Sequence, residues 1–118
     1  MKGSKFISKF FESYDVTHLF FVPVILPYTF AEIDKNTNIQ RIMTHSEKSA
    51  VYMADGYARA SKKPGVCMAQ KVGAANIAAG LRDPFLACSP VVAIKDLTLI
   101  LKIEIRIKKL MISLCSKA

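Results

Sequence analysis

The chain has 118 residues, of which 52% are apolar and 22% are charged, and its formal net charge is +8. This length accommodates one domain, and the apolar fraction suffices for a packed core, which excludes a wholly disordered chain. No apolar run reaches the roughly 18 residues that a membrane-spanning helix requires, so a transmembrane helix is excluded as well. A signal peptide is not expected, because Pro23 interrupts the apolar run after the basic N-terminus and no small-residue cleavage site follows.

The positive charge is concentrated near the C-terminus. Residues 97–118 carry five basic side chains and one acidic one, so about a fifth of the chain holds half of the excess charge. These residues have no interleaved aromatics and match no nucleic-acid-binding motif, so we expect no nucleic-acid partner. Cys67, Cys88 and Cys115 are widely spaced, which disfavours a disulfide framework or a zinc site and favours a reduced, cytoplasmic setting.

The predicted elements alternate between helix and strand from the N-terminus onward. Ser4–Tyr14 places phenylalanines at helical spacing and predicts a first helix. The next apolar segment, His18–Val24, is short and bulky, so it predicts a buried strand that stops at Pro23. Beyond it we expect a helix over Tyr28–Asp34, a turn at Asn36–Asn38 and a second strand over Ile39–Thr44.

The clearest helical pattern runs from Ser46 to Ala60. Ser46 suits the N-cap, and the apolar side chains that follow at the spacing of one helix face are Ala50, Met53, Ala54 and Tyr57. After a Lys-Pro-Gly turn, the expected elements are a strand over Val66–Ala69, a helix of small residues over Gly73–Leu86 and a strand over Pro90–Ile94.

Strands that lack polar alternation and are separated by helices indicate a parallel sheet covered on both faces. We therefore predict an α/β fold with three layers, a parallel sheet between two layers of helices. Ligands of such sheets bind outside the carboxyl ends of the strands. A site is thus expected in the segments that follow Pro23, Thr44, Ala69 and Ile94.

The last part of the chain has a different composition. Residues 97–118 are mostly leucine, isoleucine and lysine, and isoleucines at 103, 105 and 107 alternate with charged residues at strand period. An exposed edge strand and a loosely packed helix both remain open. The abrupt change suggests the hypothesis of a foreign or out-of-frame end. We accordingly divide the chain into a domain over residues 1–96 and a basic tail over 97–118.

Residues 45–94 read HSEKSAVYMADGYARASKKPGVCMAQKVGAANIAAGLRDPFLACSPVVAI. This stretch resembles the N-terminal, pyrimidine-binding domain of thiamine-diphosphate-dependent enzymes of the acetolactate synthase type. The pieces that carry the resemblance are Glu47, MADGYARAS at Met53–Ser61, KPGVC at Lys63–Cys67, FFVP at Phe20–Pro23 and SPVVAI at Ser89–Ile94. Their order and spacing cover most of residues 1–94 and imply an incomplete thiamine-diphosphate-binding fold.

Glu47 has two interpretations. From the residues alone, a glutamate in the first turn of a helix is favoured by the helix dipole and by the Ser46 cap. The resemblance implies a catalytic role instead. In this family such a carboxylate binds the pyrimidine ring nitrogen and stabilises the protonated ring, which shifts it to the imino tautomer. That tautomer removes the thiazolium proton of thiamine diphosphate and leaves a nucleophilic ylide. The motif in register favours the catalytic role.

The resemblance also implies cofactor-binding residues in two loops. Pro23 shapes the loop against the pyrimidine, and Val24 stands where the family usually has glycine. KVGAAN replaces a GPGATN-like loop, so Gly73 and Asn76 are retained and Val72 would supply an apolar surface for the ring. From the residues alone, Gly73 and Asn76 also fit an ordinary helix N-terminus with Asn76 as a local cap. These departures argue against assuming the acetolactate reaction itself.

Other side chains give weaker signals. His18 and His45 are far apart and flank no cysteine or carboxylate cluster, so no metal site is expected on this chain. The pair at 88–89, a cysteine and a serine, lacks a neighbouring histidine that would suggest a nucleophile. Asp55 and Asp83 are predicted to be solvated or helix-end charges, and the methionines and phenylalanines to lie in the core.

The resemblance finally implies that a working enzyme needs a second domain, which binds the diphosphate through magnesium. No Gly-Asp-Gly motif, with which such a domain begins, occurs in the sequence. The expected partner is therefore a diphosphate-binding domain or subunit, within a dimer or higher oligomer. Three hypotheses stay open: a truncated or frameshifted fragment of a 2-oxoacid decarboxylase or carboligase, inactive alone; a small, separately encoded subunit; or a non-catalytic basic α/β interaction module. The incomplete sheet favours the first.

Overall fold

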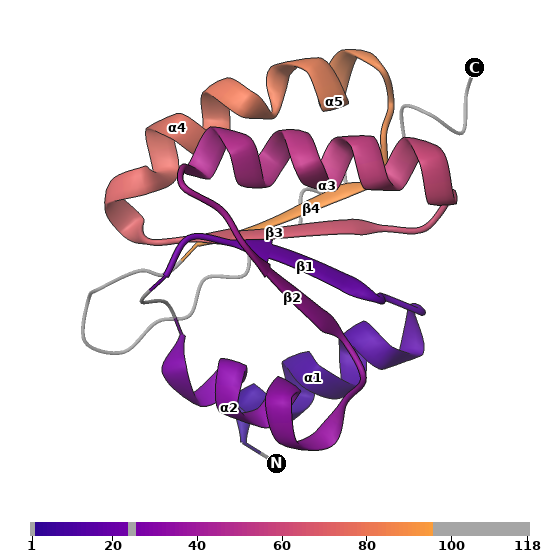
Figure 1. The fold of residues 1–118 in the computed structure, drawn as a ribbon, viewed down its shortest axis with the longest axis vertical. Coiled ribbons are helices and arrows are strands. Elements are labelled where there is room, and N and C mark those ends of the chain that lie inside the picture. The colour runs from indigo at the N-terminus through magenta and orange to yellow at the C-terminus, as the bar shows by residue number, and fades with distance from the viewer. Residues whose placement is uncertain (1, 24–25, 96–118) are drawn as a thin grey trace.

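The computed structural model describes residues 2–23 and 26–95 (Figure 1). The helices are α1 (Gly3–Ser13), α2 (Pro27–Asn36), α3 (Glu47–Ser61), α4 (Ala74–Gly80) and α5 (Arg82–Leu86), with a 3-10 turn η1 (Lys71–Gly73). The strands are β1 (His18–Phe21), β2 (Gln40–Met43), β3 (Gly65–Ala69) and β4 (Val91–Lys95). The alternation of helices and strands predicted from the sequence is confirmed.

The four strands form one parallel sheet in the order β2-β1-β3-β4. Helices α1 and α2 cover one face, and α3, α4 and α5 cover the other (Figure 1). The chain moves one way from β1 to β2 and the opposite way from β2 to β3. Because parallel crossovers are right-handed, this reversal places α2 and α3 on opposite faces. The predicted three-layer α/β fold is confirmed.

Two apolar cores lie on the two faces of the sheet, and β3 contributes to both. Its side chains alternate, so Val66 and Met68 join the core beneath α1 and α2, while Cys67 and Ala69 join the core beneath α3 and α4. All five residues of β3 are buried, as expected for a central parallel strand. By contrast, three of the four residues of the edge strand β2 are exposed.

Helix α3 packs closely on the sheet. Its buried face consists of small residues, including Ala50, Ala54 and Ala58. At the start of β3, a Cβ on Gly65 would collide with the backbone carbonyl of Ala54, so only glycine permits this approach. The close packing fixes the position of the whole of α3, including its first turn.

The single helix predicted over Gly73–Leu86 is wrong. The segment instead forms η1, α4 and α5, with Leu81 between the last two. Pro84 gives the physical reason, because a proline has no N–H to bond the carbonyl of Gly80 and its ring would clash with it. The chain therefore breaks between the two short helices.

Several aromatic and methionine side chains predicted to be core are exposed. Phe11, Phe20 and Met68 are buried, whereas Phe6, Met43, Met53 and Phe85 are exposed. Met53 is 42% exposed, whereas Val51, two residues before it on α3, is buried.

Among the helices in residues 2–23 and 26–95, none has the length and apolar character needed to cross a membrane. The basic tail over 97–118, with its predicted strand pattern, lies outside the described residues, as does Val24.

Candidate functional site

The order of the strands points to one crevice. The chain leaves β1 toward one side of the sheet and returns to β3 on the other, so the two connections diverge between the carboxyl ends of β1 and β3. In open parallel sheets such a reversal is the point at which ligands bind. The segments after β1 and β3 and the first turn of α3 meet here. These are the segments in which the sequence analysis placed all of its site residues.

The segments after β1 and β3 are tied together. The backbone N–H of Val22 donates to the carbonyl of Met68 at 3.3 Å, which extends the pairing beyond the end of β1. Next to this pair, the side-chain Nε2 of Gln70, which follows β3, donates to the carbonyl of Pro23 at 3.0 Å. Pro23 therefore lies where the sequence predicts it, exposed at the carboxyl edge, with its carbonyl held by the loop that follows β3.

The first turn of α3 is fixed by two hydroxyl groups. Ser46 is the N-cap, and its Oγ accepts a hydrogen bond from the Ser49 N–H at 3.1 Å, which confirms the predicted cap. The buried Thr44 hydroxyl lies 3.2 Å from the carbonyl oxygen of Phe21 and 3.0 Å from that of Ser46, so its one proton can serve either. These contacts hold the start of α3 against the end of β1.

Glu47 is half-buried at this start and is held by a different element. Its Oε2 accepts a hydrogen bond from Nδ2 of Asn76 in α4 at 3.0 Å. The side chain also lies against Gly73, where a Cβ would come within 2.5 Å of Oε1 and 2.6 Å of Cδ of Glu47. Such distances are impossible, so the carboxylate occupies space that only a glycine at 73 leaves open. Within the described residues, Oε1 accepts no hydrogen bond.

The structure thus brings Glu47, Gly73 and Asn76 together. It also excludes one of the two interpretations of Asn76 left open by the sequence, because the N-terminus of α4 has no side-chain cap. The local-cap interpretation is wrong, since the amide reaches across to α3 instead. Val72 lies beside this group and is 83% exposed, so its apolar side chain faces outward and is available to a ligand.

Sequence reasoning missed Gln70 and Thr44, which connect the loops of the site. Each is a polar residue placed directly after a strand, Gln70 behind β3 and Thr44 behind β2. This position is the available signal, because the carboxyl ends of parallel strands share one edge. Their hydrogen bonds go to backbone carbonyls, so no partner side chain forms a sequence motif that would indicate them.

Asp55, the second carboxylate on α3, corrects a prediction. It is buried rather than solvated, with 8% of the residue exposed. Arg59, one turn further on, bonds both oxygens, with Nε 2.9 Å from Oδ1 and Nη2 2.8 Å from Oδ2. Burial alone would raise the pKa of Asp55, but the hydrogen bond and positive charge of Arg59 outweigh it and lower the pKa below its ordinary value.

Two other kinds of chemistry find no support. Within residues 2–23 and 26–95, no three histidine, cysteine, aspartate or glutamate side chains gather in a way that could hold a metal ion. Cys67 is buried in β3, and this burial raises the pKa of its thiol to about 12, so the reactive thiolate is not accessible near neutral pH.

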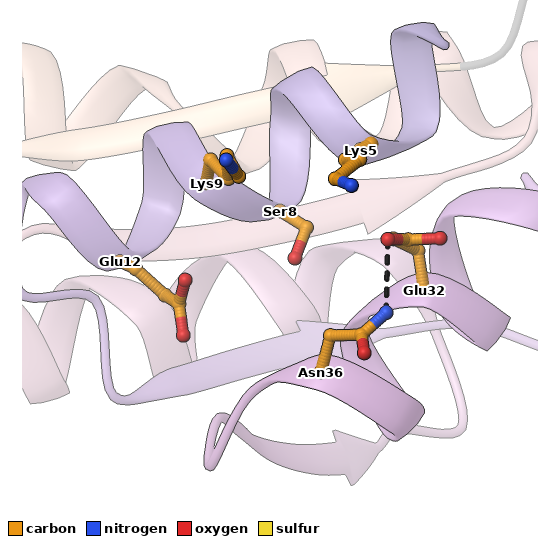
Figure 2. A pocket seen from close by; sticks show the side chains of 6 residues that line it. All are labelled: Lys5, Ser8, Lys9, Glu12, Glu32 and Asn36. Atoms are coloured by element: carbon orange, nitrogen blue, oxygen red, sulfur yellow. Dashed lines mark hydrogen bonds between the residues drawn. The ribbon is translucent and has the colours of Figure 1, made fainter. Parts of the chain in front are cut away.

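A polar cleft of about 220 Å³ lies on the other face of the sheet, between α1 and α2 (Figure 2). It is lined by Lys5, Ser8, Lys9, Glu12, Glu32 and Asn36. Nδ2 of Asn36 donates to Oε1 of Glu32 at 2.9 Å, one turn apart on the same helix (Figure 2). This pair repeats the chemistry of Asn76 and Glu47 on a single element, away from the carboxyl edge.

Comparison with known proteins shows the family of the chain. Residues 1–96 match the family described as "Thiamine pyrophosphate enzyme, N-terminal TPP binding domain". The chain is 36% identical over 97 residues to a probable acetolactate synthase large subunit of Methanocaldococcus jannaschii, and the matched region covers 80% of this chain and 16% of that protein. It is 40% identical over 63 residues to the chloroplastic acetolactate synthase of Arabidopsis thaliana, over 52% of this chain and 9% of the relative.

Among solved structures, the fold is similar to that of benzoylformate decarboxylase from Polynucleobacter necessarius, with a TM-score of 0.68. The similarity covers 80% of this chain and 18% of that one, and the sequence identity of 18% makes it a likeness of fold alone. The chain thus spans less than a fifth of the length of each of these relatives.

Proposed function

The chain belongs to the thiamine pyrophosphate enzyme family, as its N-terminal TPP-binding domain of acetolactate-synthase-like type, and we propose that it supplies the pyrimidine side of a 2-oxoacid decarboxylase or carboligase active site. In this proposal a diphosphate-binding domain or subunit completes the site and holds the diphosphate through Mg²⁺. The relatives are much longer proteins, of which this chain covers 16% in the archaeal case, and this supports the need for that second part.

The observation that carries the proposal is the environment of Glu47. Its carboxylate is half-buried at the switch point of the sheet, with Oε2 held by Asn76 and Oε1 unengaged among the described residues. An aminopyrimidine ring fits such a site, because its protonated ring nitrogen is a donor that needs one fixed carboxylate oxygen. The cradle at Gly73 and the exposed apolar side chain of Val72 suit the flat, largely apolar ring.

When bound, thiamine diphosphate supplies a nucleophilic carbon for reactions of 2-oxoacids. The residues of this chain prepare it. Oε1 of Glu47 would accept the hydrogen bond of the pyrimidine ring N–H and so favour the protonated ring. Gly73 keeps the carboxylate accessible, Val72 would offer the ring an apolar surface that excludes water, and Pro23 would shape the loop against it. Val24 in that loop belongs to the same proposal and lies outside the described residues.

A purely structural α/β module offers no reason for this arrangement. The dipole of α3 favours a carboxylate here, but it does not require a position that demands glycine in another segment. The proposal applies equally whether the diphosphate-binding part is joined to this chain or is a separate subunit, since the roles of Glu47 and Gly73 are the same.

The test is a calorimetric titration of the purified chain with thiamine diphosphate and Mg²⁺, alone and with a diphosphate-binding domain taken from an acetolactate synthase. Turnover of pyruvate, as a probe 2-oxoacid, is measured in the mixture. We expect partner-dependent turnover that falls at least ~100-fold in Glu47→Gln, because the acid–base role of the carboxylate is lost. Asp55→Asn is the matched control on the same helix and is expected to retain turnover. Unchanged turnover in Glu47→Gln would show that the catalytic assignment is wrong.

A further inference from the structure

We propose that Asn76 is a positioning residue for Glu47: its side-chain amide holds Oε2 of the carboxylate, so that Oε1 is presented to the pyrimidine. The role of Oε1 rests on the proposed function. The positioning itself concerns two residues of this chain and is open to measurement without a cofactor.

The first argument is the freedom that Glu47 would otherwise have. A glutamate side chain has three rotatable bonds, and fixing them carries an entropic cost that something must offset. The dipole of α3 attracts the carboxylate but does not select one oxygen or one rotamer. The Asn76 hydrogen bond at 3.0 Å and the surface of Gly73 do select, because one binds Oε2 and the other leaves room for Oε1.

The second argument is that Asn76 has no other task. It lies in the first turn of α4 but does not cap that helix, and its side chain is exposed. Within the described residues, the bond to Glu47 is the one hydrogen bond that its side chain forms. Asparagine is also a poorer helix former than alanine, so helix propensity does not explain its presence.

The third argument is that the donor stands on a rigid element. Helix α4 packs against α3 at Gly80, where even a Cβ would lie only 3.0 Å from Cβ of Val51. At the other end, the N–H of Gly73 donates to the carbonyl of Gln70 at 3.1 Å, and Gln70 is itself bonded to Pro23. A donor fixed at both ends can hold the carboxylate to the precision that a catalytic group requires.

The experiment measures the rotamers of Glu47 by NMR in the full chain without cofactor. Three-bond couplings and ¹³C relaxation of the Glu47 side chain are compared in the wild type, Asn76→Ala and Asn76→Gln. We expect one dominant rotamer in the wild type, rotamer averaging in Asn76→Ala, and recovery in Asn76→Gln, which keeps the amide. The matched control is Asn36→Ala, which removes an Asn-to-Glu hydrogen bond of 2.9 Å from α2 (Figure 2) and should leave Glu47 unchanged.

A second measurement uses 4-amino-5-hydroxymethyl-2-methylpyrimidine, the pyrimidine half of the cofactor, as the probe. We expect Asn76→Ala to bind it about 3- to 10-fold more weakly, the range that one hydrogen bond provides, and Asn36→Ala to bind it as the wild type does. Unchanged Glu47 couplings in Asn76→Ala overturn the positioning role. A wild type that binds neither this probe nor thiamine diphosphate, even with the diphosphate-binding domain present, but shows the expected couplings, overturns the proposed function and leaves the positioning role standing.

Discussion

Helix α3 carries two carboxylates, Glu47 and Asp55, that are about two turns apart and are held in opposite ways. Asp55 is buried, and Arg59 on the same helix bonds both of its oxygens. Glu47 is half-buried, and one of its oxygens is bonded by Asn76 on another helix. Asp55 is thus satisfied locally, whereas Glu47 depends on how two helices and a loop are arranged.

The difference separates a structural charge from a functional one. A buried carboxylate with both oxygens bonded by one arginine is shielded from a ligand, and its partner stabilises the fold. A carboxylate with one fixed and one unengaged oxygen is prepared for a ligand, and preorganisation of this kind is what catalytic groups need. The comparison predicts that changes around Glu47 alter binding, while changes around Asp55 alter stability.

Among the substitutions near Glu47, Gly73→Ala should weaken binding of the aminopyrimidine probe the most. The new Cβ would occupy the space within 2.6 Å of Glu47 Cδ, so the carboxylate must leave its position or the 3-10 turn must shift. We expect binding of the aminopyrimidine probe to weaken more than about 10-fold, because the acceptor is displaced as well as freed. NMR titration measures the affinity, and circular dichroism reports whether the fold persists.

The control for this glycine is Gly56→Ala on α3. A Cβ on Gly56 meets no atom within 4 Å, so the substitution gains helix propensity without a clash. We expect it to stabilise the chain by about 0.5–1 kcal/mol and to leave probe binding unchanged. Equal probe binding by Gly73→Ala and the wild type would contradict the steric account of Gly73.

Asp55→Asn tests the structural half of the comparison. It removes a charge-assisted pair, and we expect a loss of about 1–2 kcal/mol in the free energy of unfolding at pH 7, measured by urea denaturation. The solvent reaches the half-exposed Arg59, which keeps the loss in this range. Probe binding should not change.

The pH dependence of this loss has a definite sign. The pKa of Asp55 is lower in the folded chain than its ordinary value, so the folded state favours the charged form. The stabilisation is therefore complete above about pH 4, the ordinary pKa of aspartate, and is lost as the pH falls through the lower folded pKa. The gap between the wild type and Asp55→Asn should close in acid, and a gap that stays constant down to pH 2 would contradict the role of the charge.

The three-layer fold predicted from the sequence is confirmed, and the reasons are local. Apolar strands separated by helices and a serine cap before Glu47 are patterns that neighbouring residues carry, and they placed each strand within a few residues of its position. The resemblance to the family then added Gly73 and Asn76 to the residues expected at the carboxyl edge of the sheet.

What the sequence could not show depends on distant contacts. From the sequence alone, the amide of Asn76 fits a helix cap equally well. Its bond to Glu47, 29 residues away in the chain, becomes visible only once α4 is packed against α3. The burial of Asp55 likewise depends on how closely α3 lies on the sheet. The break at Leu81 is different, because its cause, Pro84, is a local signal that the preceding run of small helix-forming residues outweighed in the prediction.

Of these changes, Glu47→Gln should have the smallest effect on stability. A small effect would distinguish Glu47, the functional carboxylate, from Asp55, the structural one. Glutamine keeps the shape and an acceptor oxygen for Asn76, so the hydrogen bond at 3.0 Å can persist. The loss is then mainly the attraction between the negative charge and the N-terminus of α3, about 0.5 kcal/mol at low ionic strength. Urea denaturation in low and high salt measures it, and we expect the difference to shrink in high salt as the charge is screened. A loss as large as that of Asp55→Asn would mean that Glu47 is needed to hold the fold, and the two carboxylates would no longer divide into a structural and a functional one.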